Sequence, residues 1–127
     1  MRKLFIFLLL STFMNSVIAY DVIADEEYLK KEIDLLPYDV THMEIKKSII
    51  DVMIKSKWVI NEHKNNYLIG VYDGRPKVKI TIGKKTLTIS EVPTSASFHK
   101  RWINSLHGHI IHRLEYYHQV RIANRLL

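Results

Sequence analysis

Period-two alternation between residues 58 and 89 constrains the fold of this chain more than any other feature. Apolar residues gather there in four short runs, at positions 58–60, 67–72, 78–82 and 87–89. In the last two runs every second residue is apolar, and lysine or threonine stands between. Alternation of this kind is typical of antiparallel strands with one buried and one solvated face. We therefore expect a four-stranded antiparallel meander with turns at 62–66, 73–76 and 83–85.

Two segments with helical spacing flank these strands. The first begins with Thr41 and Glu44, which match a capping box. One face of this expected helix carries Ile45, Ile49, Val52 and Met53. The second follows a loop and carries Trp102, Ile103, Leu106, Ile110 and Leu114 along one side. We predict an α+β fold in which both helices pack on the apolar face of the sheet.

The first residues are typical of a signal peptide. Arg2 and Lys3 precede an apolar run at 4–10, and Ala19 supplies a small residue at a cleavage site. Polar residues interrupt the apolar run too early for a membrane-spanning helix of roughly 20 residues. We expect residues 1–19 to be cleaved, and the mature chain to be periplasmic or secreted, with no transmembrane segment.

Residues 20–40 form a separate N-terminal segment ahead of the domain at 41–127. Acidic residues at 25–27 precede Tyr28, Leu29, Ile33 and Leu36, which lie at helical spacing, and Pro37 follows. Acids in a first turn complement the helix dipole, and proline ends a helix. We therefore expect a short N-terminal helix that ends before Pro37.

The composition and motifs of the sequence exclude several classes of function. The chain of 127 residues has no cysteine, which excludes disulfides, thiol catalysis and cysteine metal sites. Its net charge is +6, but the lysines are scattered rather than gathered into a stripe with aromatic platforms, so we do not expect a nucleic-acid partner. No nucleophile, zinc-protease or phosphate-loop motif is present. We therefore predict no enzymatic activity and no cofactor.

Histidines gather near the end of the chain. His109 and His112 lie three residues apart, a spacing that places two ligands on one helical face. Viewed down the helix they fall opposite the apolar side, so we expect both to face solvent. A zinc or copper site at His109 and His112 is an alternative function.

The wet face of the expected sheet is the best candidate for an interaction surface. Its predicted residues lie on the strand and hairpin around the second turn: Tyr72, Arg75, Lys77 and Lys79. A partner could also bind by adding a strand to an exposed edge of the sheet. We predict a small binding or protein-interaction module whose partner is an envelope protein or an anionic surface component. The remaining alternative is an inhibitor of, or an enzyme acting on, envelope glycan or peptide.

The order of the apolar motifs resembles a known group. The motifs are Trp58-Val59-Ile60, Leu68-Ile69-Gly70-Val71, Val78-Lys79-Ile80-Thr81-Ile82, and Trp102-Ile103 with Leu106, Ile110 and Leu114. They resemble small, largely uncharacterised bacterial envelope proteins, many of them lipoproteins. The resemblance implies a helix, a four-strand meander and a closing helix, and supplies no catalytic residue. This chain differs from the group in lacking a lipidation cysteine and in having His99-Lys100 where a Tyr-Asn pair is usual.

Overall fold

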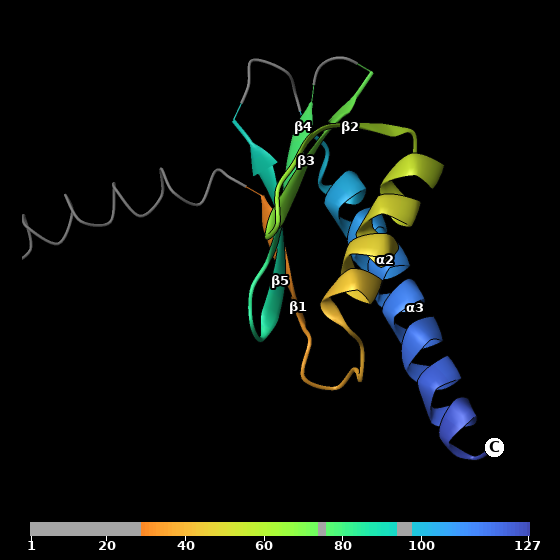
Figure 1. Ribbon diagram of the computed structural model, residues 1–127. Coiled ribbons are helices and arrows are strands. Elements are labelled where there is room, and N and C mark those ends of the chain that lie inside the picture. The colour runs from red at the N-terminus through yellow and green to blue at the C-terminus, as the bar shows by residue number, and fades with distance from the viewer. Residues whose placement is uncertain (1–28, 74–75, 94–97) are drawn as a thin grey trace, which may run out of the picture.

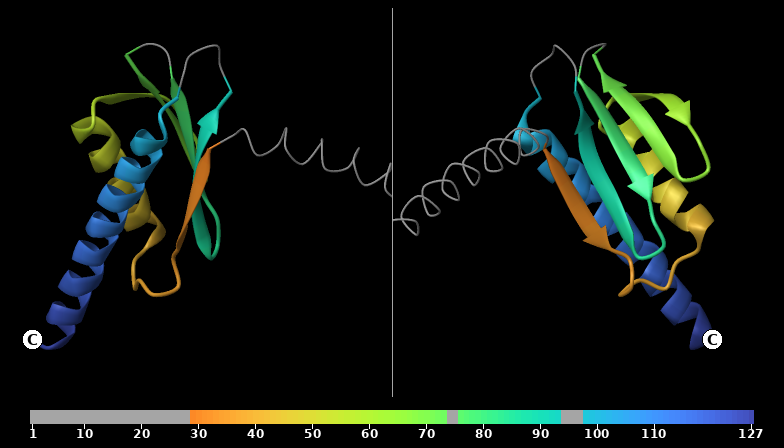
Figure 2. Two further views of the ribbon diagram at one scale, coloured as in Figure 1. Left: turned by 180° about the vertical axis from the view of Figure 1, so that it is seen from behind. Right: turned by 90° about the vertical axis from the view of Figure 1, so that its left-hand side faces the viewer.

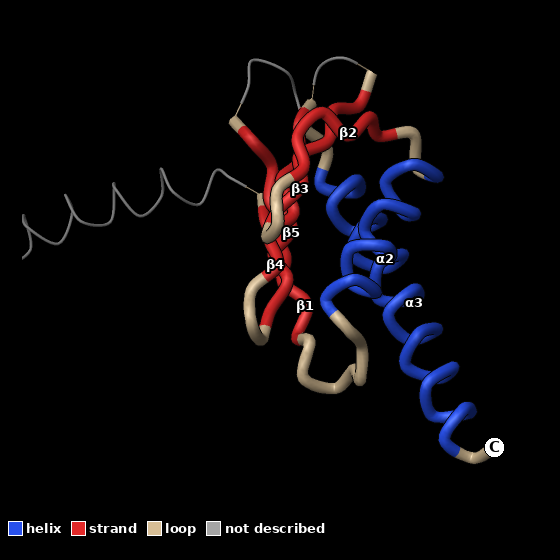
Figure 3. Tube along the Cα trace, viewed as in Figure 1, coloured by secondary structure: helices blue, strands red, loops and turns tan. Residues whose placement is uncertain are grey.

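A computed structural model describes residues 29–73, 76–93 and 98–127. They form an antiparallel sheet with two helices on one of its faces (Figures 1 and 3). The predicted α+β fold with an antiparallel sheet is therefore confirmed. The predicted signal peptide with its expected cleavage after Ala19, and Arg75 of the predicted interaction surface, lie outside the described residues.

The sheet has five strands, so the prediction of four was wrong. In chain order the elements are β1 (Lys30–Asp34), α2 (His42–Lys55), β2 (Trp58–His63), β3 (Tyr67–Tyr72), β4 (Lys77–Ile82), β5 (Thr86–Val92) and α3 (Lys100–Arg125). The strand order is β1-β5-β4-β3-β2, with each neighbouring pair antiparallel. The four strands at 58–92 follow one another along the chain, and β1 adds to the edge at β5.

The fifth strand lies where the sequence indicated the short N-terminal helix. That prediction was wrong for the described part of residues 25–36, because β1 pairs with β5 in the register Ile33↔Leu87. Ile33 is buried against the core, and the Leu35 N–H donates to the Lys85 carbonyl oxygen (2.8 Å). Backbone bonds along an open sheet edge and one buried side chain outweigh helical propensity, which is a weak preference.

The core lies between the sheet and the two helices. Its fully buried strand residues alternate along β3, β4 and β5, as the sequence predicted: Leu68, Val78, Ile80, Leu87 and Ile89. Each such side chain contributes roughly 1.5–3 kcal/mol through burial. Gly70 faces the same core, and a Cβ there would overlap the Met53 Cε, so this strand approaches α2 closely. The burial pattern therefore assigns one face of the sheet to the core.

The start of α2 follows the predicted capping box. The Glu44 N–H donates to the Thr41 hydroxyl (3.1 Å), and the Thr41 N–H donates to the Glu44 carboxylate (2.8 Å). Ile45, Ile49, Val52 and Met53 are buried as predicted. Met43 is 61% exposed because it lies on the other side of the first turn.

The last helix, α3, crosses the sheet and extends past it (Figure 2). Its buried side chains are the predicted ones, Ile103, Leu106, Ile110 and Leu114. The helix runs unbroken through Gly108. Among the described residues, no helix combines the length and apolarity needed to cross a membrane.

Aromatic side chains fasten the start of α3 to one end of the sheet. Trp58 is 5% exposed, and its ring lies 5.4 Å from Tyr72 and 6.3 Å from Trp102, centroid to centroid. Phe98 lies 5.4 Å from Trp102 and 6.0 Å from Trp58. Both tryptophans therefore anchor the helices to the sheet and do not form an open stacking surface.

Candidate functional site

The face of the sheet opposite the helices is the candidate functional site. Both described helices lie against the other face, so no described helix covers this outer face (Figure 2). Its residues alternate with the core residues along each strand. On β2 to β5 they include Val59, Tyr67, Ile69, Val71, Lys77, Lys79, Thr81, Thr88, Ser90 and Val92.

Cross-strand register gathers apolar and basic side chains in two adjacent rows. One row crosses from β2 to β5 through Val59, Val71, Lys77 and Val92. The next row contains Glu62, Ile69, Lys79, Ser90 and Lys30, so one acid lies in it with the two lysines. Val59 is 66% exposed, whereas valine on a sheet usually packs against a neighbour. We name six of these residues the outer-face patch: Val59, Ile69, Val71, Lys77, Lys79 and Val92.

One lysine of the outer-face patch is held by its neighbours. The Lys79 Nζ lies 4.5 Å from the centre of the Tyr67 ring, close enough for a cation–π interaction. The Tyr67 hydroxyl donates to the Glu62 carboxylate, and this hydrogen bond raises the pKa of Tyr67 above its usual 10.0. The arrangement orders Lys79 on the face while Lys77 stands beside the valines.

The structure divides the four residues of the predicted interaction surface. Lys77 and Lys79 lie on the outer face, and Lys77 pairs with Val71. Tyr72 follows Val71 in the strand and therefore points to the opposite face, where it packs between Trp58 and Trp102. Val59, Ile69, Val71 and Val92 were not predicted on this face, although their alternation with core residues was a usable signal.

The β2 edge of the sheet has no strand partner among the described residues. The register shifts between Ile60 and Glu62, which marks an irregularity in the pairing of β2 with β3. Bulges of this kind bend a strand and make its edge less suited to continuous pairing. Strand addition at this edge therefore has only the short stretch before Glu62 to use.

His109 and His112 are both exposed and both line one cavity between α2 and α3. The His109 Nδ1 lies 2.8 Å from the Ser105 carbonyl oxygen, so a metal would have to bind through Nε2. In the described part of the chain, no three His, Asp or Glu residues come together as metal ligands. Lys55 and Arg113 line the same cavity and would repel a metal cation.

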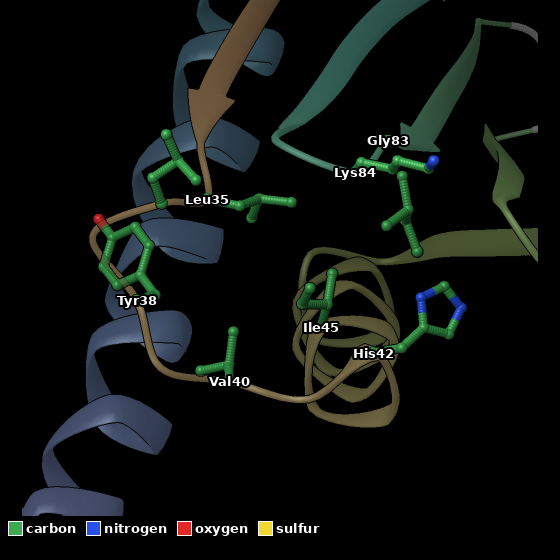
Figure 4. A pocket seen from close by; sticks show the side chains of 9 residues that line it. Leu35, Tyr38, Val40, His42, Ile45, Gly83 and Lys84 are labelled. Carbon is green, nitrogen blue, oxygen red and sulfur yellow. The ribbon is translucent and has the colours of Figure 1, made fainter.

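A second cavity, of about 580 Å³, lies where the loop after β1 meets α2 and the β4–β5 turn (Figure 4). Leu35, Val40 and Ile45 surround it, and the rings of Tyr38 and His42 stand at opposite ends. Burial raises the pKa of Tyr38 above its usual 10.0. The His42 Nε2 lies 2.9 Å from the Asn65 carbonyl oxygen, a contact that ties α2 to the β2–β3 turn. This cavity offers an apolar recess without a nucleophile beside a base.

Several acids are already paired with cations. The Asp51 carboxylate lies 2.8 Å from the Arg113 Nη2, and Asp39 forms ion pairs with Arg121 and Arg125. Glu44 accepts from Thr41 and from Arg121. These carboxylates hold helices and loops together, and Asp39 and Glu44 share the guanidinium of Arg121.

Comparison with known proteins adds no relative. No protein-family model matches the chain, and no curated protein matches it either.

Proposed function

We propose that this chain is a binding module of the cell envelope, and that its outer-face patch contacts a protein partner. The observation that carries this proposal is a row of valines on the face that no described helix covers, in which Val59 is exposed and Val71 and Val92 are half-buried, with lysines beside them. Apolar side chains that lie together on an exposed sheet face favour burial against a partner. The positive charge of the lysines beside them disfavours partners with a positively charged surface.

The composition of the patch indicates the chemistry of the partner. Val59, Val71 and Val92 offer a narrow apolar strip, while Lys77 and Lys79 stand beside it with Lys30 close by. A matching surface carries apolar side chains next to aspartates or glutamates. We therefore assign the partner to acidic envelope proteins rather than to nucleic acid.

The location follows from the first residues of the chain. A basic start, an apolar run and Ala19 favour export followed by cleavage, which places the module in the periplasm or outside the cell. The resemblance of the apolar motifs to small envelope proteins supports the same compartment. A binding role without catalysis is supported by the ion pairs that occupy Asp39, Glu44 and Asp51.

The test is capture of partners from envelope extract with immobilised protein that begins at Tyr20. Wild type is compared with Val59→Glu, which places an anion in the apolar row, and with Lys77→Glu, which reverses a charge in the same row. The matched controls are Ile54→Glu, at a 61% exposed position on α2, and Lys47→Glu on the same helix. All five proteins are assayed at about pH 7 with and without a chelator.

We expect one stoichiometric protein partner, retained in chelator and by both control variants, and lost with Val59→Glu and Lys77→Glu. Retention by both patch variants would overturn the proposal. Loss in chelator would favour the histidines instead, and binding of anionic lipid vesicles without any protein partner would replace a protein interface with membrane association.

A further inference from the structure

We propose that the cavity between α2 and α3 binds a small organic anion, a phosphomonoester or carboxylate joined to a short apolar body. The cavity has a volume of about 430 Å³, within the range of roughly 300–1,000 Å³ typical of small-molecule sites. It is lined by Val52, Lys55, Ser56, His109, His112 and Arg113. This site is separate from the outer-face patch, which lies on the far side of the sheet.

Charge is the first reason for an anion. Lys55 from α2 and Arg113 from α3 both line the cavity, and no acid lines it. Asp51 offsets part of the Arg113 charge from outside the lining, and Lys55 and Arg113 together still attract an anion into the recess. The carbonyl groups at the end of α2 oppose this effect, but those of Val52 and Ile54 already accept from Ser56 and Lys57.

The state of Arg113 is the second reason. Its Nη2 donates to the Asp51 carboxylate (2.8 Å), and its guanidinium carbon lies 5.3 Å and 5.5 Å from the ring centres of Tyr116 and Tyr117. The guanidinium is therefore held in place before any ligand arrives. Its Nε is buried without a hydrogen-bond partner in the described structure. A ligand would meet the accessible part of this side chain, which is 30% exposed, and not the buried Nε; a guanidinium fixed in this way suits carboxylate or phosphate oxygens.

The apolar lining is the third reason, and it separates an organic anion from a simple ion. Val52 is 4% exposed and forms part of the wall between the helices. The methylene stems of Lys55 and Arg113 add apolar surface beside it. Ser56 supplies a hydroxyl that donates or accepts. A ligand with a charged head and a few methylene groups therefore fits both parts of the lining better than inorganic phosphate does.

The experiment is isothermal titration of the purified protein with hexyl phosphate at about pH 7, alongside hexanol and inorganic phosphate. We expect saturable binding of hexyl phosphate, with weaker binding of either fragment alone. Lys55→Gln and Arg113→Gln should each weaken binding about tenfold, because each removes one of the two cations. Lys47→Gln, which makes the same charge change elsewhere on α2, should leave affinity unchanged.

A further variant gives a readout that a purely structural role would not produce. Asp51→Asn removes the negative charge that competes for Arg113, while Tyr116 and Tyr117 still hold the guanidinium and the amide oxygen can still accept from it, so the variant should tighten hexyl phosphate binding even if it lowers thermal stability. The proposal is overturned if wild type shows no saturable binding, if hexanol binds equally well, or if Lys47→Gln weakens binding as much as Lys55→Gln. Binding only to vesicles that display phosphatidic acid, and not to free hexyl phosphate, would also overturn it.

Discussion

The two halves of α3 are held to the rest of the molecule by different interactions. The first of these parts, residues 100–114, buries Ile103, Leu106, Ile110 and Leu114, none more than 3% exposed, against the sheet and α2. The second half extends past the sheet (Figure 1) and contacts the loop before α2 and its first turn through Arg121, Arg125 and His118. The His118 Nδ1 accepts a hydrogen bond from the Asp39 N–H (2.9 Å), and its ring lies edge-on to Tyr38. One helix therefore shows both apolar packing and surface ion pairing.

The difference shows how unequal these two kinds of contact are. Burial of an apolar side chain contributes roughly 1.5–3 kcal/mol, whereas an exposed ion pair contributes about 0–1 kcal/mol. The first half should therefore determine whether the domain folds. The second half should determine where the end of the helix lies, and how that position depends on salt and pH.

The largest expected effect is that of Ile110→Ala in the buried half. Ile110 is 0% exposed, so truncation removes apolar contacts and leaves a cavity, at about 2–5 kcal/mol of unfolding free energy. Urea unfolding measures this change, with Tyr116→Ala, at a 55% exposed position on the same helix, as control. Equal losses for the two variants would contradict the contrast between buried and exposed faces.

Gly108→Ala should stabilise the same half by about 0.5–1 kcal/mol, because alanine has the higher helix propensity. A Cβ at Gly108 meets no atom within 4 Å, so no clash opposes the gain. Gly70→Ala provides the contrast, since its Cβ would force the buried Met53 to move. Thermal unfolding should show the first variant above wild type and the second below it, and the reverse order would refute this interpretation.

Arg121→Gln tests the second half and should lower stability by about 0.2–1 kcal/mol. Arg121 pairs with Glu44, and its Nε donates to the Asp39 carbonyl oxygen (2.9 Å). The loss should shrink when urea unfolding is repeated in about 1 M salt, because salt screens exposed pairs. A loss of unfolding free energy as large as that of Ile110→Ala, or one that salt leaves unchanged, would show that ion pairs are not what holds the second half of α3.

The smallest expected effect is the acid dependence that Glu44 contributes. The hydrogen bond from the Thr41 N–H, and then Arg121, lower the pKa of Glu44 below its usual 4.5. A carboxyl with a lowered pKa in the folded state adds stability above about pH 4.5, and that stability is lost as pH falls through the folded pKa. Unfolding followed from about pH 6 to about pH 3 should therefore lose less stability in Glu44→Gln than in wild type. An identical pH profile in the two proteins would contradict this assignment.

The parts of the fold that sequence predicted are those set by local pattern. The capping box at Thr41 and Glu44 and the alternation at 78–89 each lie within a few residues, so the chain alone indicates them. The strand β1 was missed because Leu29, Ile33 and Leu36 also fit helical spacing. The backbone partners that select a strand belong to β5, and no local signal indicates them.

In the candidate site too, only the features set by local alternation could be predicted from the sequence. Lysines at every second position placed Lys77 and Lys79 on one face, but assigning Tyr72 to that face ignored the same alternation. The cavity between the helices depends on Arg113 lying beside Asp51, residues 62 positions apart in the chain. Contacts at that separation follow from how the helices cross, which periodicity does not specify.

The pairing of β1 with β5 has a consequence for the order in which the domain folds. β1 is made before the other described strands, yet its partner is the last strand of the sheet. β1 can therefore pair only after the hairpins of β2 to β5 have formed. Long-range pairing of this kind is slow compared with hairpin closure. Held at an edge by backbone bonds, one buried isoleucine and exposed hydrogen bonds that link Lys31 and Glu32 to α3, β1 should also detach first in the native protein. Its amide hydrogens should exchange with solvent faster than those of β4, and equal protection would mean that the five strands open only together.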